Sequence, residues 1–274
     1  MNRVVGCVAA FGLAVVVAAP GGAFAAAAAA RTAAKPIVNP RDFSGVWMNN
    51  AAQSEQRDAN GNPVVIRGER AEREPPTPPL TPEYLEIYKK VRAQMQGKGR
   101  DPSLGDLEVN GTAECKWAGM PTIMGWPFPL EFLQTPGRIT ILMEADSQTR
   151  RVYMDGRKIP PLEELDPTYN GYSIGRWEGN TLVIDTAGIK TSVLMNGVPH
   201  SEEARIVERI RLLDKDTLEN TVTVTDPKAF TAPIVRKIVY GRRAWEIEEY
   251  SCAENNRNAV DETGATTSGI SASQ

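Results

Sequence analysis

Short runs of alternating apolar and polar residues fill the second half of the chain, and polar turns separate them. The turns include Glu178-Gly179-Asn180 and Asp214-Lys215-Asp216, which have the length and composition of hairpin turns. Four consecutive hairpins with no helix between them predict a mainly β, antiparallel up-and-down sheet, and a sheet this large hides its edges most simply by closing into a barrel. A sandwich is the alternative. The runs span residues 138–145, 150–155, 172–177, 181–186, 204–212, 218–226, 234–240 and 245–250.

The first half of the chain predicts one strand and one helix. Residues 42–47 form a short first strand, and the polar, proline-bearing segment 49–80 is expected to cross the surface. A peripheral helix follows at about 82–96, because Thr81 suits the N-cap, Pro82 the first helical position and Gly97 the end. Its apolar stripe, which Arg92 interrupts, consists of Leu85, Tyr88, Val91 and Met95.

Both ends of the chain lie outside the single barrel domain that we expect at 41–252. The start has the form of a secretory signal peptide, with a positive charge at Arg3, an apolar run over residues 4–19 and a small-x-small cleavage pattern ending at Ala25. That run is shorter than the ~20 residues that a transmembrane helix needs. We therefore expect a periplasmic or secreted protein without membrane insertion. Its parts are a cleaved signal peptide at 1–25, a flexible tether at 26–40 and a disordered tail at 253–274.

The charge of the chain limits the classes of partner it can bind, and its cysteines indicate the compartment in which it works. The chain carries 31 Lys and Arg against 34 Asp and Glu, a net charge of −3, which argues against nucleic acid or an anionic membrane surface as a partner. Cys115 and Cys252 are the cysteines beyond the expected signal peptide, and in an oxidising compartment they most simply form one disulfide. Two free or metal-binding thiols are the alternative, although neither cysteine has a second Cys or a His at ligand spacing.

The alternation also assigns one face of each strand to the barrel interior, and several of these apolar faces contain polar residues. A buried charge is costly unless it is paired or hydrogen-bonded. One interpretation is a structural lattice of ion pairs between the arginines and glutamates, and the other is a polar pocket for a small ligand. A register slip of one residue would undo both. The interior polar residues predicted in this way are Tyr172, Arg176, Glu208, Asn220, Arg236, Tyr240 and Glu249.

The pocket interpretation gives some of these residues chemical roles. An interior arginine, Arg176 or Arg236, offers a rigid fork that suits a carboxylate or a phenolate. The only histidine, His200, lies in a loop between two predicted strands, where it is either a turn residue or a general acid and base. In the second case Asp185 or Glu203 would orient its ring.

The sequence contains no motif that identifies a cofactor or a metal. It has no Ser-centred nucleophile elbow, no phosphate-binding Gly-Lys-Ser/Thr loop and no dinucleotide fingerprint. A single histidine excludes a His-rich transition-metal site, and the acidic pairs Glu163-Glu164 and Glu202-Glu203 suit solvated turns better than calcium ligation. We therefore expect a protein that works without a cofactor.

The first strand resembles a lipocalin signature. Gly45-Val46-Trp47, placed ahead of a series of hairpins, is similar to the Gly-x-Trp motif of that family. The resemblance implies a calycin-like barrel in which Trp47 closes the base and packs against an arginine near the final strand. Arg242 and Arg243 are the two candidates for that arginine.

A second resemblance covers most of the expected mature chain. Phrases within 127–138, 151–157 and 173–183, together with Pro199-His200-Ser201 and Glu208-Arg209, resemble a large, mostly uncharacterised family of exported bacterial proteins. That family is common in bacteria that consume plant-derived and aromatic compounds, and it has no established catalytic residue to carry over. Its recurrent phrases contain Glu131, Asp155, Arg176 and His200.

These observations lead to two hypotheses for the function. The first is an enzyme, a cofactor-independent lyase (decarboxylase) or isomerase acting on a small aromatic or phenolic acid in a polar lumen. The second is a non-catalytic carrier or binding protein of the lipocalin type, and the oligomeric state stays open. The candidates for catalysis are His200, Glu208 and Tyr172, and those for ligand binding are Arg176, Arg236, Asn220, Glu249, Glu131 and Asp155.

Overall fold

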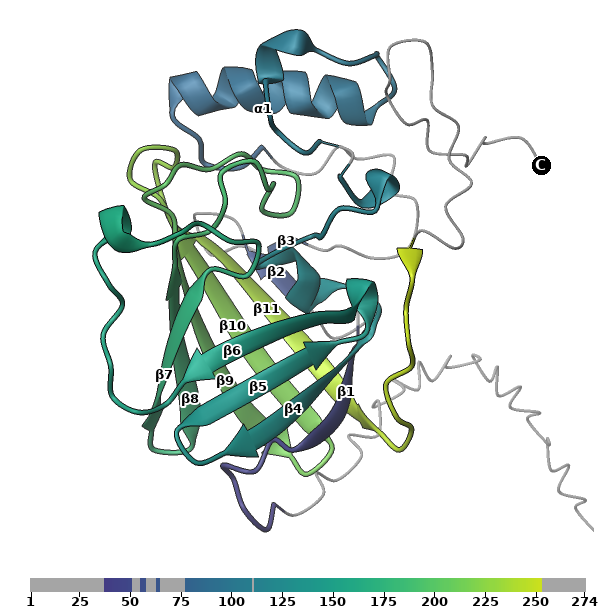
Figure 1. Cartoon of the computed structure of the whole chain (residues 1–274), viewed down its shortest axis with the longest axis vertical. Helices are drawn as coiled ribbons and strands as arrows, with labels where there is room; N and C mark the ends of the chain where they lie inside the picture. The colour runs from purple at the N-terminus through teal and green to yellow at the C-terminus, as the bar shows by residue number, and fades with distance from the viewer. Residues whose placement is uncertain (1–36, 51–54, 58–62, 65–76, 110, 253–274) are drawn as a thin grey trace, which may run out of the picture. The chain divides into compact units, whose positions relative to one another are not determined.

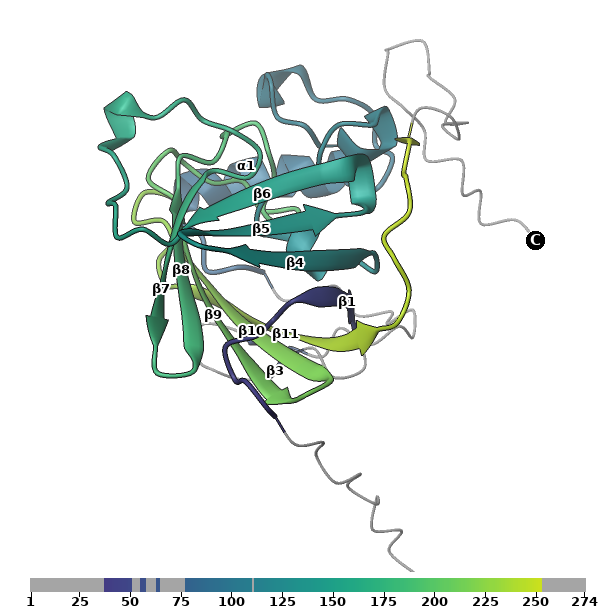
Figure 2. The ribbon, with the colours of Figure 1, turned by 60° about the horizontal axis from the view of Figure 1, so that its bottom comes forward.

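Nine strands close a barrel in the computed structural model, which describes residues 37–50, 55–57, 63–64, 77–109 and 111–252 (Figure 1). The ring closes because β1 pairs with β4 on one side and with β11 on the other (Figure 2). Two short strands, β2 (Glu55–Arg57) and β3 (Pro63–Val64), continue the sheet beyond β11. The ring consists of β1 (Gly45–Asn49), β4 (Pro129–Thr135), β5 (Arg138–Met143), β6 (Gln148–Tyr153), β7 (Tyr172–Glu178), β8 (Thr181–Ala187), β9 (Arg205–Asp214), β10 (Thr217–Thr225) and β11 (Ile234–Arg243).

The predicted mainly β barrel with one α-helix is confirmed within these residues. The expected signal peptide, most of the expected tether and the expected tail lie outside the described residues, as does much of the polar segment 49–80. No helix in the described part of the chain combines the length and apolarity that crossing a bilayer requires.

One pair of neighbouring strands in the ring, β6 and β7, is parallel. Strand direction alternates around the rest of the ring, and a closed ring with an odd number of strands cannot alternate throughout. The direction therefore repeats once, at β6–β7. These two strands share two register pairs, Val152 with Ser173 and Tyr153 with Ile174, whereas β7 and β8 share seven.

One predicted strand does not form and one strand of the ring was not predicted, and both concern the closure of the barrel. β4 was not identified as a strand from its alternation, and the run 245–250 is not a strand. The turn expected at Gly241-Arg242-Arg243 does not form, because these residues extend β11 and pair with β1. Backbone hydrogen bonding to β1 thus competes successfully with a local hairpin turn.

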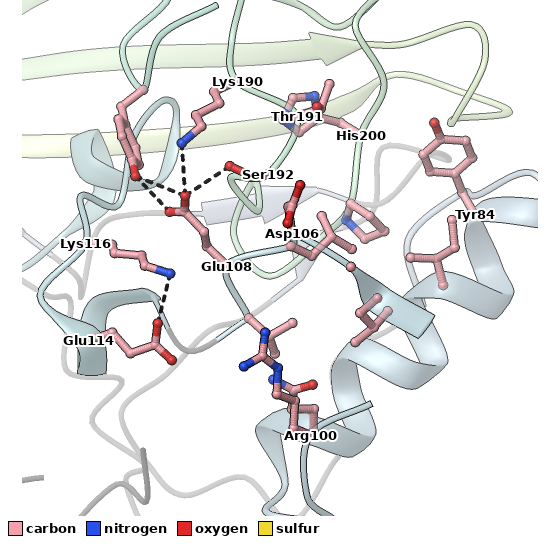
Figure 3. A pocket seen from close by; sticks show the side chains of 18 residues that line it. Tyr84, Arg100, Asp106, Glu108, Glu114, Lys116, Lys190, Thr191, Ser192 and His200 are labelled. Atoms are coloured by element: carbon pink, nitrogen blue, oxygen red, sulfur yellow. Dashed lines mark hydrogen bonds and ion pairs between the residues drawn. The ribbon is translucent and has the colours of Figure 1, made fainter. Parts of the chain in front are cut away.

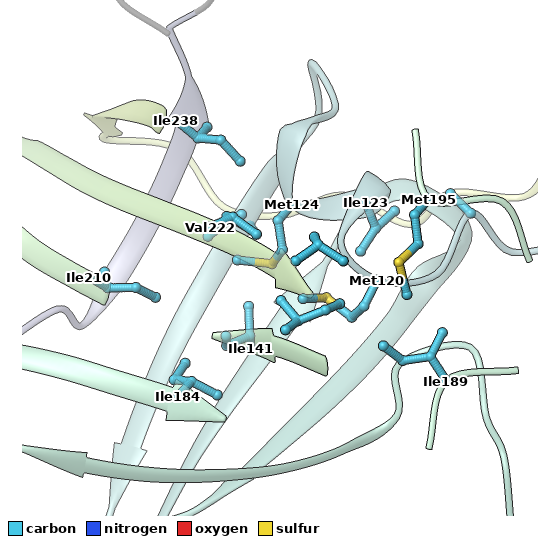
Figure 4. Close-up of a cluster of buried hydrophobic side chains, with 14 of the residues drawn as sticks. Met120, Ile123, Met124, Ile141, Ile184, Ile189, Met195, Ile210, Val222 and Ile238 are labelled. Carbon is cyan, nitrogen blue, oxygen red and sulfur yellow. The ribbon is translucent and has the colours of Figure 1, made fainter. Parts of the chain in front are cut away.

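Apolar side chains fill the interior of the barrel. Strand residues such as Ile141, Ile184 and Ile210 belong to one buried apolar cluster with Met120 and Met124, which come from the segment between α1 and β4 (Figure 4). That segment ends in a short 3₁₀ helix, Thr122–Gly125. Because it packs into the same core as the strands, it acts as a plug for one end of the barrel.

The helix α1 (Pro82–Met95) matches its predicted position and lies beyond the plugged end of the barrel (Figure 1). Thr81 takes the N-cap position, although its hydroxyl donates to the Lys228 carbonyl at 3.2 Å and not to the helix. A second, smaller apolar cluster holds α1 onto the loops that follow it. Its buried members are Val91, Leu104, Val109 and Leu194.

Cys115 and Cys252 form the predicted disulfide, with their Cα atoms 5.5 Å apart. The bond joins the segment that follows α1 to the last described residue, across a sequence separation of 137. It therefore links two parts of the chain that share no strand pairing.

Trp47 is a packing residue at the point of closure. Its ring is fully buried, its Nε1 donates to the Phe43 carbonyl at 2.8 Å, and the Arg242 guanidinium lies 4.2 Å from the ring centroid. Arg242 is thus the arginine that the lipocalin resemblance implied, whereas Arg243 lies over Trp245 at 5.5 Å.

We predict that Trp47→Ala lowers the free energy of unfolding by about 3–5 kcal/mol, as for other large-to-small core changes. The matched control is Trp245→Ala, since that side chain is 54% exposed and its loss should change stability by no more than about 0.5 kcal/mol. Urea denaturation of both variants measures the difference. Equal stability of the two variants would contradict the role of Trp47.

We predict that removal of the disulfide, in a variant with Cys115→Ser and Cys252→Ser, lowers the free energy of unfolding by about 4–5 kcal/mol. The reason is the long loop that the bond closes in the unfolded chain. Denaturation with and without reductant measures the effect in the wild type, and the double variant should not respond to reductant. Two thiols that alkylate freely in the native, non-reduced protein would refute the pairing.

Candidate functional site

A polar cluster lies inside the barrel, among the apolar core residues. Each of the six consecutive strands from β6 to β11 contributes one side chain to it, and all six side chains are buried. Hydrogen bonds link the members of the cluster, some between neighbouring strands and some, from Arg150 on β6, across to β8 and β9. We call it the interior polar cluster, and its members are Arg150, Ser173, Thr186, Glu208, Asn220 and Tyr240.

Glu208 is the centre of this cluster. Arg150 Nη2 donates to Glu208 Oε2 at 2.5 Å and to Thr186 Oγ1 at 2.9 Å. Arg150 Nε also donates to Ser173 Oγ at 3.2 Å, and Asn220 Nδ2 donates to Glu208 Oε1 at 2.9 Å. The prediction that Glu208 faces the interior is therefore right, but the predicted partners Arg176 and Arg236 were wrong.

Tyr240 completes the cluster, with its hydroxyl donating to the Met124 carbonyl of the plug at 2.8 Å. Burial raises the pKa of Tyr240 well above its ordinary value, and the nearby Glu208 carboxylate raises it further. The phenol thus stays protonated and keeps its donor role. Two cluster atoms, Arg150 Nη1 and Asn220 Oδ1, have no hydrogen-bond partner among the described residues.

The interior position predicted for Arg176 was wrong. Its side chain is 58% exposed and donates to Glu178 on the outer face of β7. The inner face of β7 instead carries buried Ser173 and then Gly175, where an added Cβ would lie 2.5 Å from the Met154 sulfur. Because the inner residues are small and the outer Tyr172 and Ile174 are apolar, the alternation indicates the wrong face.

Four other predicted site residues lie outside the interior. Tyr172 lies half-buried on the outer side of β7, where its ring packs against Tyr153 at 5.2 Å. Asp155 is exposed, and the Arg157 guanidinium holds the pKa of its carboxyl at about 2. Glu131 lies between the buried Leu130 and Phe132 of β4 and so faces outward, and Glu249 is exposed in the segment after β11.

Arg236 does lie on the inner face of β11, close to the plug. Its Nη1 donates to Asn196 Oδ1 at 2.9 Å, and a Cβ added at Gly125 would meet its guanidinium at 2.6 Å. Burial lowers the pKa of this guanidinium. Arg236 therefore ties the plug to the loop between β8 and β9.

A pocket of about 900 Å³ lies between α1 and the loops next to it (Figure 3). We call it the large pocket. Its walls are one face of α1, residues from 100–109 and 114–116, Tyr169 and the loop 190–200 between β8 and β9. Among the predicted candidates, His200 lines it.

Glu108 organises one wall of the large pocket, and its carboxylate is 8% exposed. The Tyr169 hydroxyl lies 3.0 Å from both carboxylate oxygens, and the Ser192 hydroxyl donates to Oε1 at 3.0 Å. Lys190 Nζ lies 3.3 Å from the same oxygen (Figure 3). Burial raises the pKa of Tyr169, and the Glu108 contact raises the pKa of Lys190, so both remain protonated donors.

Of the other charged groups that line the large pocket, some form ion pairs and some do not. Lys116 Nζ lies 2.9 Å from Glu114 Oε2, and this contact raises the pKa of the lysine. Asp106 and Arg100 also line the pocket, and neither has an ion-pair or hydrogen-bond partner among the described residues. Figure 3 shows the Asp106 carboxylate directed into the space between Glu108 and Tyr84. Among the described residues, the pocket therefore offers one cation and one anion without a partner, Arg100 and Asp106.

His200 is buried at the edge of the large pocket. Its Nδ1 lies 2.8 Å from the Ser201 carbonyl oxygen, which can only accept, so the neutral ring carries its proton on Nδ1. Burial lowers the pKa of His200, against contacts with the Ser201, Val193 and Lys190 backbone that raise it. Its Nε2 makes no hydrogen bond of standard geometry among the described residues. The predicted orienting carboxylates were wrong, because this backbone carbonyl takes their place and Asp185 pairs with Arg205 at 3.5 Å.

The residues that form most of the large pocket were not identified from the sequence. Glu108, Tyr169 and Lys190 lie in segments without strand or helix periodicity, so no pattern places them together. The described residues contain no group of three or more His, Cys, Asp or Glu side chains arranged as a metal site.

Comparisons with known proteins do not establish a family. No family model matches the chain, and no curated protein matches it. Among solved structures, the chain is similar to a mutant of the fluorescent protein UnaG, with 14% identity over 74% of this chain and 97% of that chain and a TM-score of 0.30. This TM-score does not establish a common fold, so the description of the barrel rests on its own strand pairing.

We predict that Glu208→Ala lowers the free energy of unfolding by about 3–5 kcal/mol, because it leaves the Arg150 charge buried without its acceptor. The double change Arg150→Met with Glu208→Leu should recover most of that loss. Glu178→Ala, which breaks the exposed pairs with Arg176 and Arg209, is the control and should change stability far less. Urea denaturation measures all three, and wild-type stability of Glu208→Ala would contradict the prediction.

We predict that His200 makes the protein less stable in mild acid. Because the folded-state pKa lies below the ordinary value of ~6.5, the unfolded chain takes up a proton first as the pH falls. The stability that His200 contributes is complete above the unfolded pKa and is lost toward the folded pKa. Urea denaturation should show a larger fall between pH 7.5 and 5.5 for the wild type than for His200→Gln. Equal falls would contradict this.

Proposed function

We propose that the protein binds a small organic acid in the large pocket between α1 and the adjacent loops. The observation that carries the proposal is the guanidinium of Arg100, which has no partner among the described residues and lines a pocket of about 900 Å³. The other cations of the pocket, Lys116 and Lys190, are already paired. Pockets that combine apolar walls with a few convergent polar groups are typical of small-molecule sites. A closed barrel with loops at one end is a common scaffold for such sites.

The walls of the pocket favour an acid that also has an aromatic or phenolic part. Tyr84 and Tyr169 contribute aromatic rings, and Leu104 and Val109 contribute apolar surface. Arg100 would hold the carboxylate, and Asp106 would accept a hydrogen bond from a ligand hydroxyl. A fatty acid fits these walls less well, because its long chain offers no partner for the Asp106 carboxylate.

Catalysis is a second candidate function, and His200 is the observation that favours it. A neutral imidazole at the edge of a pocket, whose Nε2 makes no hydrogen bond of standard geometry among the described residues, has the protonation state of a general base. The reaction would be a cofactor-independent decarboxylation or isomerisation. Without turnover, the same pocket serves a carrier. A location outside the cytoplasm is supported by the Cys115–Cys252 disulfide, since such bonds persist in oxidising compartments.

Titration calorimetry with hydroxylated aromatic acids such as vanillate and ferulate tests the binding. Arg100→Gln should weaken binding by ~10-fold or more, as expected for the loss of a charge-assisted hydrogen bond. Lys98→Gln is the matched control, because Lys98 is exposed nearby and does not line the pocket. Equal affinity of Arg100→Gln and wild type for every acid that binds would refute the site.

Mass spectrometry of each bound acid after incubation tests for turnover. An enzyme should convert the acid, and His200→Gln should abolish conversion while the affinity changes little. Binding without any conversion would support the carrier.

A further inference from the structure

A second, smaller pocket of about 270 Å³ lies behind one wall of the large pocket. We call it the small pocket. Glu108 and Val109 line both pockets and so form the wall between them. The rings of Trp117, on the side of the small pocket, and Tyr169, on the side of the large one, touch edge to face at 5.7 Å. The two spaces are therefore separate but built on the same segment.

The small pocket presents apolar surface that the fold leaves uncovered. Met95 and Trp117 line it and are 45% and 43% exposed, which makes them two of the few large apolar side chains at the surface of the described chain. Trp126 from the end of the plug lines it as well. Exposed apolar side chains gathered around a hollow are a common sign of a binding site.

The polar groups of the small pocket are predominantly donors. Arg92 Nε is buried and has no hydrogen-bond partner among the described residues. Asn196 uses its Oδ1 to accept from Arg236, which leaves its amide Nδ2 as a donor. The Thr122 hydroxyl is already satisfied, because it donates to the Leu194 carbonyl and accepts from the Asn196 backbone.

Glu108 does not make the small pocket anionic. Its carboxylate accepts hydrogen bonds from Tyr169, Lys190 and Ser192 on the other side of the wall. Arg92 is then the one lining charge without a partner in the described structure. A ligand that completes this pocket must carry an anionic acceptor for Arg92 and a flat apolar body for the two tryptophans.

We infer that the small pocket binds the ring and carboxylate of a single-ring aromatic acid without a hydroxyl group, because the polar groups left free among its described residues are donors and offer a ligand hydroxyl no acceptor. The hydroxylated acids of the proposed function bind in the large pocket. The volume of the small pocket is less than the ~300–1,000 Å³ of drug-sized sites, which suits one ring and excludes a long chain. The guanidinium fork of Arg92 meets the carboxylate, and the ring lies against Trp117 and Trp126. The inference rests on the proposed function, because both concern an aromatic acid. It differs in the binding site, since the ring lies in the small pocket and not beside Arg100 in the large one.

Calorimetry and two-dimensional amide NMR with benzoate, benzamide and cyclohexanecarboxylate test this assignment. Benzoate should bind the wild type more tightly than the uncharged benzamide and the non-aromatic cyclohexanecarboxylate. It should also shift the indole NH signal of Trp117, which is identified among the five tryptophans by its absence in Trp117→Leu.

The variants separate the two pockets. Arg92→Gln should weaken benzoate binding by ~10-fold or more without changing the affinity for benzamide. Lys89→Gln, an exposed change on the same helix, should leave both affinities unchanged. Thermal unfolding midpoints close to that of the wild type establish that each variant is folded, and Trp117→Leu provides an independent test if Arg92→Gln is not.

Three results would overturn the inference. The first is wild-type benzoate affinity in both Arg92→Gln and Trp117→Leu. The second is a loss of affinity in Arg100→Gln alone, which would place the acid in the large pocket and leave the proposed function intact. The third is no binding of benzoate at concentrations up to about 10 mM, whereas the proposed function is judged separately by the hydroxylated acids and Arg100→Gln.

Discussion

Backbone pairing of β1 with both β4 and β11 is the constraint on which the rest of the barrel depends. Without this five-residue strand the sheet would have two long open edges, and open edges are sites of misassociation. Trp47 stabilises the junction from inside, and Arg242 covers it by stacking on the indole. The need to pair with β1 also explains why β11 continues through Gly241 without turning there.

Strand pairing closes the wall of the barrel but leaves its two ends open. At the end near α1, the plug between α1 and β4 covers the opening. Met120 and Met124 occupy interior space that would otherwise be a lumen. Polar groups suited to a ligand therefore gather outside the barrel, between α1 and the loops around it. Because Glu108 fixes Tyr169, Lys190 and Ser192 together, these loops hold their positions without regular secondary structure.

Much of the barrel could be predicted from the sequence, and much of the candidate site could not. Alternation identified the inner faces of β9 and β10 because their inward residues are apolar, apart from Glu208 and Asn220. It failed on β7, where small inward residues contrast with apolar outward ones, and on β6, where Arg150 lies inside between polar neighbours. The loops of the large pocket have no period to detect. The one sign of the small pocket in the sequence is Arg92, which interrupts the apolar stripe of α1.

The parallel pairing of β6 with β7 affects where the barrel opens locally. With two register pairs, β6 and β7 share the shortest pairing in the ring, so local opening should need the least free energy there. Side chains reinforce this seam on both faces. Arg150 reaches across it to Ser173 inside, and Tyr153 packs on Tyr172 outside. The buried charge of Arg150 thus stabilises the strand junction at which the barrel opens most easily.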